Sequence, residues 1–172
     1  EQFLALSRPF ELNLKNSSLQ DLLKNLTTLL QEEASSQDIQ IQAETDSDLP
    51  LIKMDHEKLT QAFLNIMKNG MQAMEQGGVL RVKTQPLKDQ VEISFSDFSP
   101  GIPTESMETI FNYYYTTQEK GVGLGLPIAH RIIEAHRGQL KVESQVGTGT
   151  RMTIMLPLKN GKRDLWKKQK PL

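Results

Sequence analysis

Cysteine is absent from this sequence of 172 residues, and no apolar stretch is long enough to form a membrane-spanning helix. Without cysteine the chain forms neither a disulfide framework nor a thiolate metal site, which suits a reducing compartment. A membrane helix needs about 20 apolar residues in succession, and none of the apolar runs comes near that length. The three histidines, His56, His130 and His136, are scattered along the chain, so we expect no zinc cluster.

An excess of charge of either sign is also lacking, since 20 basic residues face 21 acidic ones and the net charge is −1. A chain so close to neutral offers no electrostatic reason to bind nucleic acid. Hydrophobic residues make up 37% and charged residues 24%, as in globular proteins, and the length is that of one ordinary domain. We therefore expect a cytoplasmic domain. The lysine-rich residues 159–172 are expected to form a disordered tail, with an electrostatic contact to a partner as the alternative.

Apolar residues recur with the period of a helix in three stretches, at residues 19–30, 56–74 and 126–137. Ser17 or Ser18 is placed to cap the first of these helices, and Gly77 ends the second. Residues 1–9 begin with a helical fragment that Pro9 stops, and we expect this fragment to be the end of a helix in a longer protein.

Alternation of apolar and polar residues predicts six strands, at residues 39–42, 51–54, 79–84, 91–96, 139–143 and 150–156. Residues 10–14 are a further candidate for a short strand. Helices on one face of a mixed, mostly antiparallel sheet of about five strands give an α+β fold, the two-layer sandwich. Residues 104–120 lack a period and predict a long loop, and such loops are often functional lids.

Glycine occupies every second position from Gly121 to Gly125, directly before the third helical stretch. Backbone amides without side chains, followed by the start of a helix, are typical of a phosphate site. The spacing is neither that of a dinucleotide fingerprint nor that of a Walker loop. An ordinary glycine-rich turn before a helix is the alternative at this point.

Three polar residues elsewhere are candidates for binding a ligand. Asn65 and Asn69 lie one helical turn apart and therefore on one face, at the border of the apolar stripe. Asp97 follows a strand and precedes a turn, where its carboxylate can accept a hydrogen bond from a base or cap that turn. An ordinary polar helix border and a capped turn are the alternatives. His136 is expected to be packed in the core, and His130 belongs to no motif.

Five motifs follow one another along the chain: N-x-x-x-N at 65–69, D-x-x-P-G at 97–101, I-F-x-x-x-Y-T-T at 110–117, G-x-G-L-G-L at 121–126 and G-T-G-T at 147–150. In this order the sequence resembles the catalytic ATP-binding domain of bacterial sensor histidine kinases, the Bergerat or GHKL fold. The resemblance covers residues 10–158 and points to the nitrogen-regulation-type branch. It implies that residues 1–9 end a dimerisation and phosphoacceptor helix.

The resemblance implies a site for ATP and Mg²⁺. Asn69 would bind Mg²⁺, Asn65 would lie beside the phosphates, and Asp97 would accept the adenine amino group. Asn65, Asn69 and Lys120 would be the catalytic residues. The remaining residues implied to contact the nucleotide or its lid are Gly101, Ile102, Phe111, Tyr114, Tyr115, Thr116, Thr117, Gly121, Val122, Gly123, Leu124, Gly125, Leu126, Gly147, Thr148, Gly149 and Thr150.

The resemblance also implies a reaction, the transfer of the ATP γ-phosphoryl group to a histidine on a helical hairpin N-terminal to this chain. The parent protein would be a homodimer and this fragment a monomer, with a response regulator as a further partner and an inner-membrane anchor left open. Asn65 stands where hydrolytic relatives carry a glutamate, so hydrolysis is expected to be slow. Phe98 and Ser99 depart from the usual adenine motif. A degenerate domain that acts as a protein-interaction module is therefore the alternative.

Overall fold

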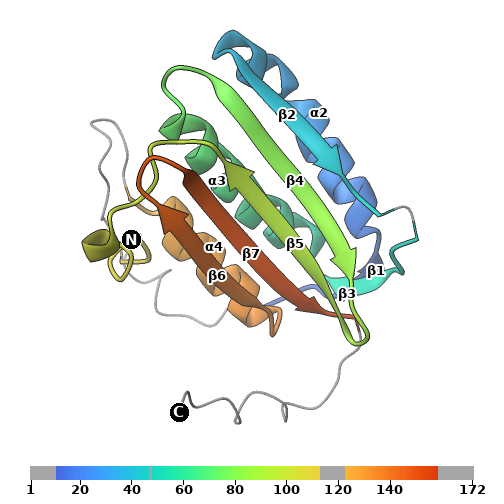
Figure 1. The fold of residues 1–172 in the computed structure, drawn as a ribbon. Helices are drawn as coiled ribbons and strands as arrows, with labels where there is room; N and C mark the ends of the chain where they lie inside the picture. The colour runs from blue at the N-terminus through green and yellow to red at the C-terminus, as the bar shows by residue number, and fades with distance from the viewer. Residues whose placement is uncertain (1–10, 47, 113–122, 159–172) are drawn as a thin grey trace, which may run out of the picture.

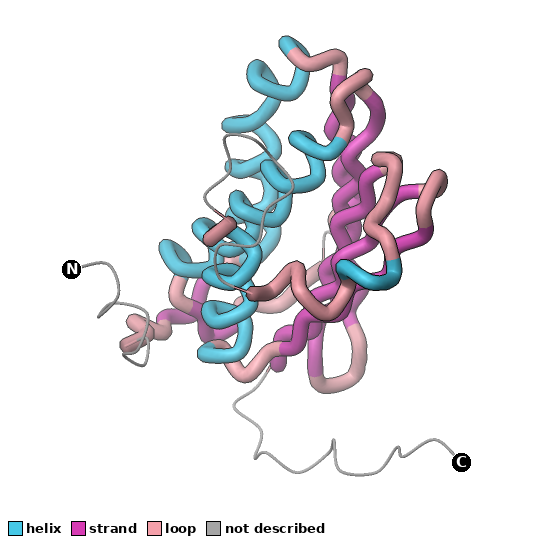
Figure 2. The backbone as a smooth tube through the Cα atoms, turned by 90° about the vertical axis from the view of Figure 1, so that its left-hand side faces the viewer, coloured by secondary structure: helices cyan, strands magenta, loops and turns pink. Residues whose placement is uncertain are grey.

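Two layers make up the fold in this computed structural model, which describes residues 11–46, 48–112 and 123–158. One layer contains the helices α2 (Leu19–Ser36), α3 (His56–Ala73) and α4 (Gly125–Ala135). The other is a twisted sheet, and all three helices lie on the same side of it (Figures 1 and 2). Within the described ranges no helix combines the length and the apolar character that crossing a bilayer requires.

The sheet has five strands in the order β2-β4-β5-β7-β6. Its members are β2 (Ile39–Glu44), β4 (Gly78–Pro86), β5 (Gln90–Asp97), β7 (Gly149–Pro157) and β6 (Gln139–Gln145). β2 is parallel to β4, and the other three pairs are antiparallel. This arrangement confirms the predicted α+β sandwich with a mixed, mostly antiparallel sheet on three helices.

The core lies between the two layers and follows from the alternation in the strands. Val91, Ile93 and Phe95 of β5 face the helices and are buried, while the residues between them face away. The ring of Phe63 on α3 packs against Phe95 with 5.5 Å between centroids. Burying a side chain of this size stabilises the fold by about 1.5–3 kcal/mol. The core therefore fixes α3 over the middle of the sheet.

Side chains cap two of the helices. Ser18 accepts a hydrogen bond from the backbone N–H of Asp21 at 3.0 Å, which decides between the two predicted caps of α2. Asp55, which the sequence analysis overlooked, caps α3 by accepting from the backbone N–H of Lys58 at 3.0 Å. α4 begins without a capping side chain. Its first turn is therefore the exception among these three helices.

Two predicted boundaries are wrong. The first short strand is β1 (Lys15–Ser17), paired with β3 (Ile52–Met54), and does not lie at residues 10–14. The backbone N–H of Asn13 instead donates to the Asp55 carboxylate at 2.9 Å. The third helix ends at Ala135, because Arg137 adopts a left-handed conformation with φ of 59° and the N–H of Gly138 returns to the carbonyl of Ile133.

A buried polar junction forms at the end of α4. The Nε2 atom of His136 accepts a hydrogen bond from the backbone N–H of Asp55 at 2.9 Å. Its Nδ1 atom lies 2.8 Å from the Ile132 carbonyl, so the ring proton is on Nδ1. The Asp55 carboxylate in turn accepts from Asn13. The prediction that His136 is packed in the interior is confirmed, and the junction ties the N-terminal segment to both helices.

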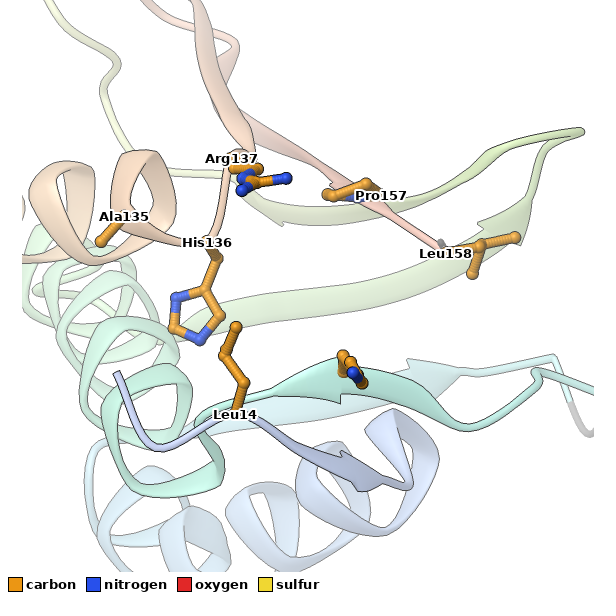
Figure 3. A pocket seen from close by; sticks show the side chains of 7 residues that line it. Leu14, Ala135, His136, Arg137, Pro157 and Leu158 are labelled. Atoms are coloured by element: carbon orange, nitrogen blue, oxygen red, sulfur yellow. The ribbon is translucent and has the colours of Figure 1, made fainter. Parts of the chain in front are cut away.

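A small surface cavity adjoins this junction (Figure 3). The His136 ring and the Leu14 side chain point toward one another across it. Lys53 and Arg137 also line the cavity, and Asp55 is the acid beside the ring.

Stability is expected to fall as the pH drops below about 6.5, the ordinary pKa of histidine. Burial lowers the pKa of His136, and the Ile132 carbonyl and the Asp55 charge oppose this effect. A folded pKa below the ordinary value of about 6.5 means that the stabilisation is complete above that pH and is lost below it. In thermal denaturation followed by circular dichroism, His136→Gln should lose this pH dependence, whereas His56→Gln should keep it. An unchanged pH dependence in His136→Gln would contradict the assignment.

Candidate nucleotide-binding site

The first turn of α4 offers backbone N–H groups to a ligand. Gly123 has a positive φ of 67°, and Leu124 precedes the helix without a side-chain cap. Pro127 has no N–H, and the N–H of Ile128 is already bonded to the Leu124 carbonyl at 3.1 Å. An uncapped start of an eleven-residue helix favours a bound anion through its amides and its dipole.

Asn65 of α3 contacts the start of α4 directly. Its Nδ2 atom donates a hydrogen bond to the Gly125 carbonyl at 3.1 Å. A Cβ atom added at Gly125 would lie 3.7 Å from the Cβ of Asn65, so the two helices are in van der Waals contact here. Asn69 lies one turn further along α3 and, like Asn65, is half-buried. The structure thus places the predicted asparagine face next to the start of the third helix.

Asp97 ends β5 and is held by two backbone groups. Its Oδ1 atom accepts hydrogen bonds from the N–H of Ser99 at 3.1 Å and from the N–H of Thr150 at 3.2 Å. A Cβ atom added at Gly70 of α3 would lie 3.3 Å from the other carboxylate oxygen, Oδ2. Burial raises the pKa of Asp97, against the hydrogen bonds from Ser99 and Thr150. Asp97 therefore does cap the following turn, and both backbone hydrogen bonds go to its Oδ1 atom.

The turn after β5 packs tightly against the turn that joins β6 and β7. Gly101 has φ of 81°, and a Cβ atom there would overlap the Gln145 carbonyl oxygen. Gly149 has φ of 125°, and a Cβ atom there would overlap the Asp97 carbonyl oxygen. The N–H of Gly147 donates to the Pro100 carbonyl at 2.8 Å. One glycine of each motif, Gly101 and Gly149, is thus required for the close approach of two backbones.

Comparison with known proteins identifies the family. Residues 54–160, more than half of the chain, match the family of histidine kinase-, DNA gyrase B- and HSP90-like ATPases. The chain belongs to this family. Among curated proteins, it is 39% identical over 160 residues to sporulation kinase C of Bacillus subtilis and 36% identical over 163 residues to the sensor histidine kinase ZraS of Escherichia coli K12. These alignments cover 92% and 95% of this chain, and 37% and 35% of the relatives.

Solved histidine kinases have the same fold. Full-length ShkA in complex with AMPPNP superposes with a TM-score of 0.82 at 27% identity, covering 95% of this chain and 35% of ShkA. The nucleotide-free catalytic domain of ThkA superposes with a TM-score of 0.76 at 27% identity, covering 87% of this chain and 97% of that domain. The chain thus has the fold of histidine kinase catalytic domains and spans about a third of the length of the curated relatives. Its placement in the nitrogen-regulation-type branch stays a prediction.

Part of the predicted lid, residues 104–120, lies within the described residues. Thr104–Ser106 form one turn of 3₁₀ helix, which the prediction of an irregular loop missed. Ile110 is buried, and the Phe111 ring packs on the ring of His130 of α4 with 5.0 Å between centroids. The segment that ends at Phe111 is thus in contact with α4. The predicted site residues that lie outside the described residues are Tyr114, Tyr115, Thr116, Thr117, Lys120, Gly121 and Val122.

The other predicted residues fall into two groups. Leu126 is the second residue of α4 and is buried, and Ile102 follows the turn after β5. Thr148 is exposed in the turn between β6 and β7, and Thr150 is buried behind Asp97. The structure therefore brings the predicted residues together at two places, which α3 joins.

Sequence reasoning missed Ser144 of β6. Its Oγ atom accepts a hydrogen bond from the N–H of Ile102 at 2.8 Å and donates to the Gly149 carbonyl at 2.9 Å. A single serine in an alternating strand gives no signal in one sequence. Ser99, noted as a departure from the usual adenine motif, is buried within the turn, where its Oγ atom accepts from the N–H of Gly101 at 3.2 Å.

Proposed function

We propose that this domain binds Mg²⁺-ATP between α3 and α4 and transfers the γ-phosphoryl group to a histidine on a helical domain of the parent protein. The main support for this proposal is that α3 contacts both parts of the site. Asn65 of α3 contacts Gly125 at the start of α4, and Gly70, five residues later, packs against Asp97. One helix thereby joins an anion-binding helix terminus to a half-buried carboxylate, as a nucleotide with a charged and a neutral end requires.

The base is proposed to lie against Asp97. A carboxylate oxygen accepts hydrogen bonds only, and adenine presents an exocyclic amino group that donates them. With Oδ1 bonded to the backbone of Ser99 and Thr150, Oδ2 is the oxygen for this contact. Gly101, Ile102, Gly147, Thr148, Gly149 and Thr150 are proposed to close this end of the site.

The phosphates are proposed to lie at the start of α4, against the amides of Gly123, Leu124, Gly125 and Leu126. Asn65 is held beside them by its bond to Gly125. The side-chain oxygen of the half-buried Asn69 fits a hard divalent cation, so we assign Asn69 as the Mg²⁺ ligand. Mg²⁺, when bound, neutralises charge on the phosphate oxygens. For Lys120 and the lid residues Tyr114, Tyr115, Thr116, Thr117, Gly121 and Val122, contacts to the nucleotide rest on the resemblance alone.

The transfer step asks little covalent chemistry of the domain. The Nε2 atom of the acceptor histidine forms a bond to the γ-phosphorus as the bond from that phosphorus to the bridging oxygen breaks, and ADP leaves with the electron pair. The domain positions the nucleotide and stabilises the charge that develops. Asn65 has no basic group with which to activate water, so hydrolysis is slow.

A labelling experiment with [γ-³²P]ATP tests this function. The chain is mixed with the separately prepared helical hairpin of the parent protein. We expect label on a hairpin histidine, no label on the chain alone, and slow phosphate release without the hairpin. The exposed-residue variant Gln61→Ala should label the hairpin like the wild type. Label that accumulates on the chain alone, or rapid phosphate release without the hairpin, would contradict the proposal.

The altered adenine motif favours a second function, that of an interaction module without nucleotide. Two contacts argue against this second function. The Ser99 side chain accepts a hydrogen bond from the N–H of Gly101 within the turn, and the N–H of Ser99 still donates to Asp97. Titration with a fluorescent ATP analogue separates the two functions. Binding that depends on Mg²⁺ supports the kinase, and no binding at millimolar nucleotide supports the module.

Partners are proposed for the parent protein. ThkA, which has the same fold with a TM-score of 0.79 at 24% identity, is known in complex with the response regulator TrrA; this superposition covers 92% of our chain and 46% of ThkA. We propose a response regulator as partner, a homodimer formed through the helical hairpin, and a monomeric fragment in the cytoplasm. No contact with nucleic acid is proposed.

A further inference from the structure

Ser144 of β6 lies between the two turns that surround Asp97. Its side chain is on the face of β6 that Leu140 and Val142 also use, toward the helices. Its Oγ atom has three partners: the N–H of Ile102 at 2.8 Å, the carbonyl of Gly149 at 2.9 Å and the Oγ1 atom of Thr150 at 2.9 Å. One hydroxyl thus joins the turn after β5 to the start of β7.

The protons of this cluster have one consistent arrangement. A serine hydroxyl has a single proton and two lone pairs. Ser144 donates its proton to the Gly149 carbonyl and accepts from the N–H of Ile102. Its second lone pair must therefore accept the proton of the Thr150 hydroxyl. Thr150 Oγ1 is left with lone pairs only and can accept, but not donate, a further hydrogen bond.

The same cluster reaches the Asp97 carboxylate. Thr150 donates its backbone N–H to Asp97 Oδ1 at 3.2 Å, and Asp97 Oδ1 also accepts from Ser99. Asp97 and the Thr150 hydroxyl are therefore both acceptors at the end of β5. Two acceptors suit the exocyclic amino group of adenine, which donates, and oppose the 6-oxo group of guanine, which accepts.

We propose that Ser144 is a positioning residue for adenine recognition, because it holds the turn after β5 in place and orients the Thr150 hydroxyl as an acceptor. This inference rests on the proposed function, in which the base lies against Asp97. If Ser144 only stabilised the fold, Ser144→Ala would lower the stability of the domain and weaken ATP and GTP binding by the same factor.

The test is competition of ATP and of GTP with a fluorescent ATP analogue on the whole chain. Ser144→Ala is expected to bind ATP about tenfold more weakly, since one acceptor is lost or misdirected, while GTP affinity changes by less than about twofold. The ratio of the two affinities therefore falls about tenfold. Ser144→Thr, which keeps the hydroxyl, should restore it. Ser94→Ala, on the opposite face of the sheet, should retain the wild-type ratio.

A second variant keeps the test decisive if Ser144→Ala does not fold. Thr150→Val retains the shape of the side chain and leaves the Ser144 contacts to Ile102 and Gly149 in place. It should lower the ATP to GTP ratio as much as Ser144→Ala, and the double variant should lose little more. An unchanged ratio in Thr150→Val, or an equal loss of both nucleotides in Ser144→Ala, would overturn the inference. Failure of the wild type to bind ATP would instead overturn the proposed function.

Discussion

Asp97→Asn is expected to weaken ATP binding by about 100-fold. A loss of this size is typical when a hydrogen bond to a charged carboxylate is replaced by two hydrogen-bond donors that face each other. The backbone N–H groups of Ser99 and Thr150 both point at Oδ1, so the amide oxygen of the new side chain takes that position. Its NH₂ group then replaces Oδ2 and faces the amino group of adenine. Two donors cannot form a hydrogen bond with each other.

The same substitution is expected to leave the fold as stable as before, or more so. Burial raises the pKa of Asp97, so ionisation of this carboxyl opposes folding. The stabilisation from a raised pKa is complete below the unfolded pKa of about 3.9 and is lost as the pH rises through the folded pKa. Asparagine never ionises, so the variant does not lose stability through ionisation of this side chain.

Two measurements on each variant check this result. The dissociation constant is taken from titration with a fluorescent ATP analogue, and Tm is taken from thermal denaturation at pH 7. Asp89→Asn, an exposed residue in the turn between β4 and β5, is the matched control and should equal the wild type in both. Near-wild-type affinity in Asp97→Asn would remove Asp97 from the base site. A large fall in its Tm would show that the carboxylate serves the fold.

Asn69→Ala is expected to slow phosphotransfer to the helical hairpin by about 10²- to 10³-fold and to remove the Mg²⁺ dependence of nucleotide binding. The substitution deletes the oxygen assigned to the metal. Asn69 is half-buried and does not belong to the core, so the fold should survive. The readout is the rate of histidine labelling as a function of Mg²⁺ concentration.

Two variants control for the loss of an asparagine. Asn69→Asp keeps an oxygen at the same position, so its nucleotide binding should still depend on Mg²⁺. Asn25→Ala, at an exposed position of α2, should label the hairpin at the wild-type rate. If Asn69→Ala responds to Mg²⁺ as the wild type does, another group holds the metal.

Much of the fold could be predicted because its elements carry strong periodic patterns. The alternation in β5 predicted that strand to within one residue at each end, and the leucines of α2 predicted its start at Leu19, although the helix continues to Ser36. The three-residue strand β1 is too short to show a period, and its place depends on pairing with β3. The end of α4 was missed because a left-handed conformation at Arg137 is not a strong preference of that residue.

The candidate site was predicted from the order of its motifs, and the structure adds the contacts between them. The bond of Asn65 to Gly125 joins residues 60 positions apart, and the junction of Asp55 with His136 joins residues 81 positions apart. No local pattern specifies such pairs. Gly101, which the resemblance implies to contact the nucleotide, packs against the backbone at Gln145, and no pattern in the sequence predicts that contact.

A structure of the chain with AMPPNP and Mg²⁺ would show where the nucleotide binds. We expect the base against Asp97 and Thr150, the triphosphate at the start of α4, and the metal bound to the side-chain oxygen of Asn69. A nucleotide bound elsewhere on the domain, or a metal without Asn69 among its ligands, would contradict this expectation.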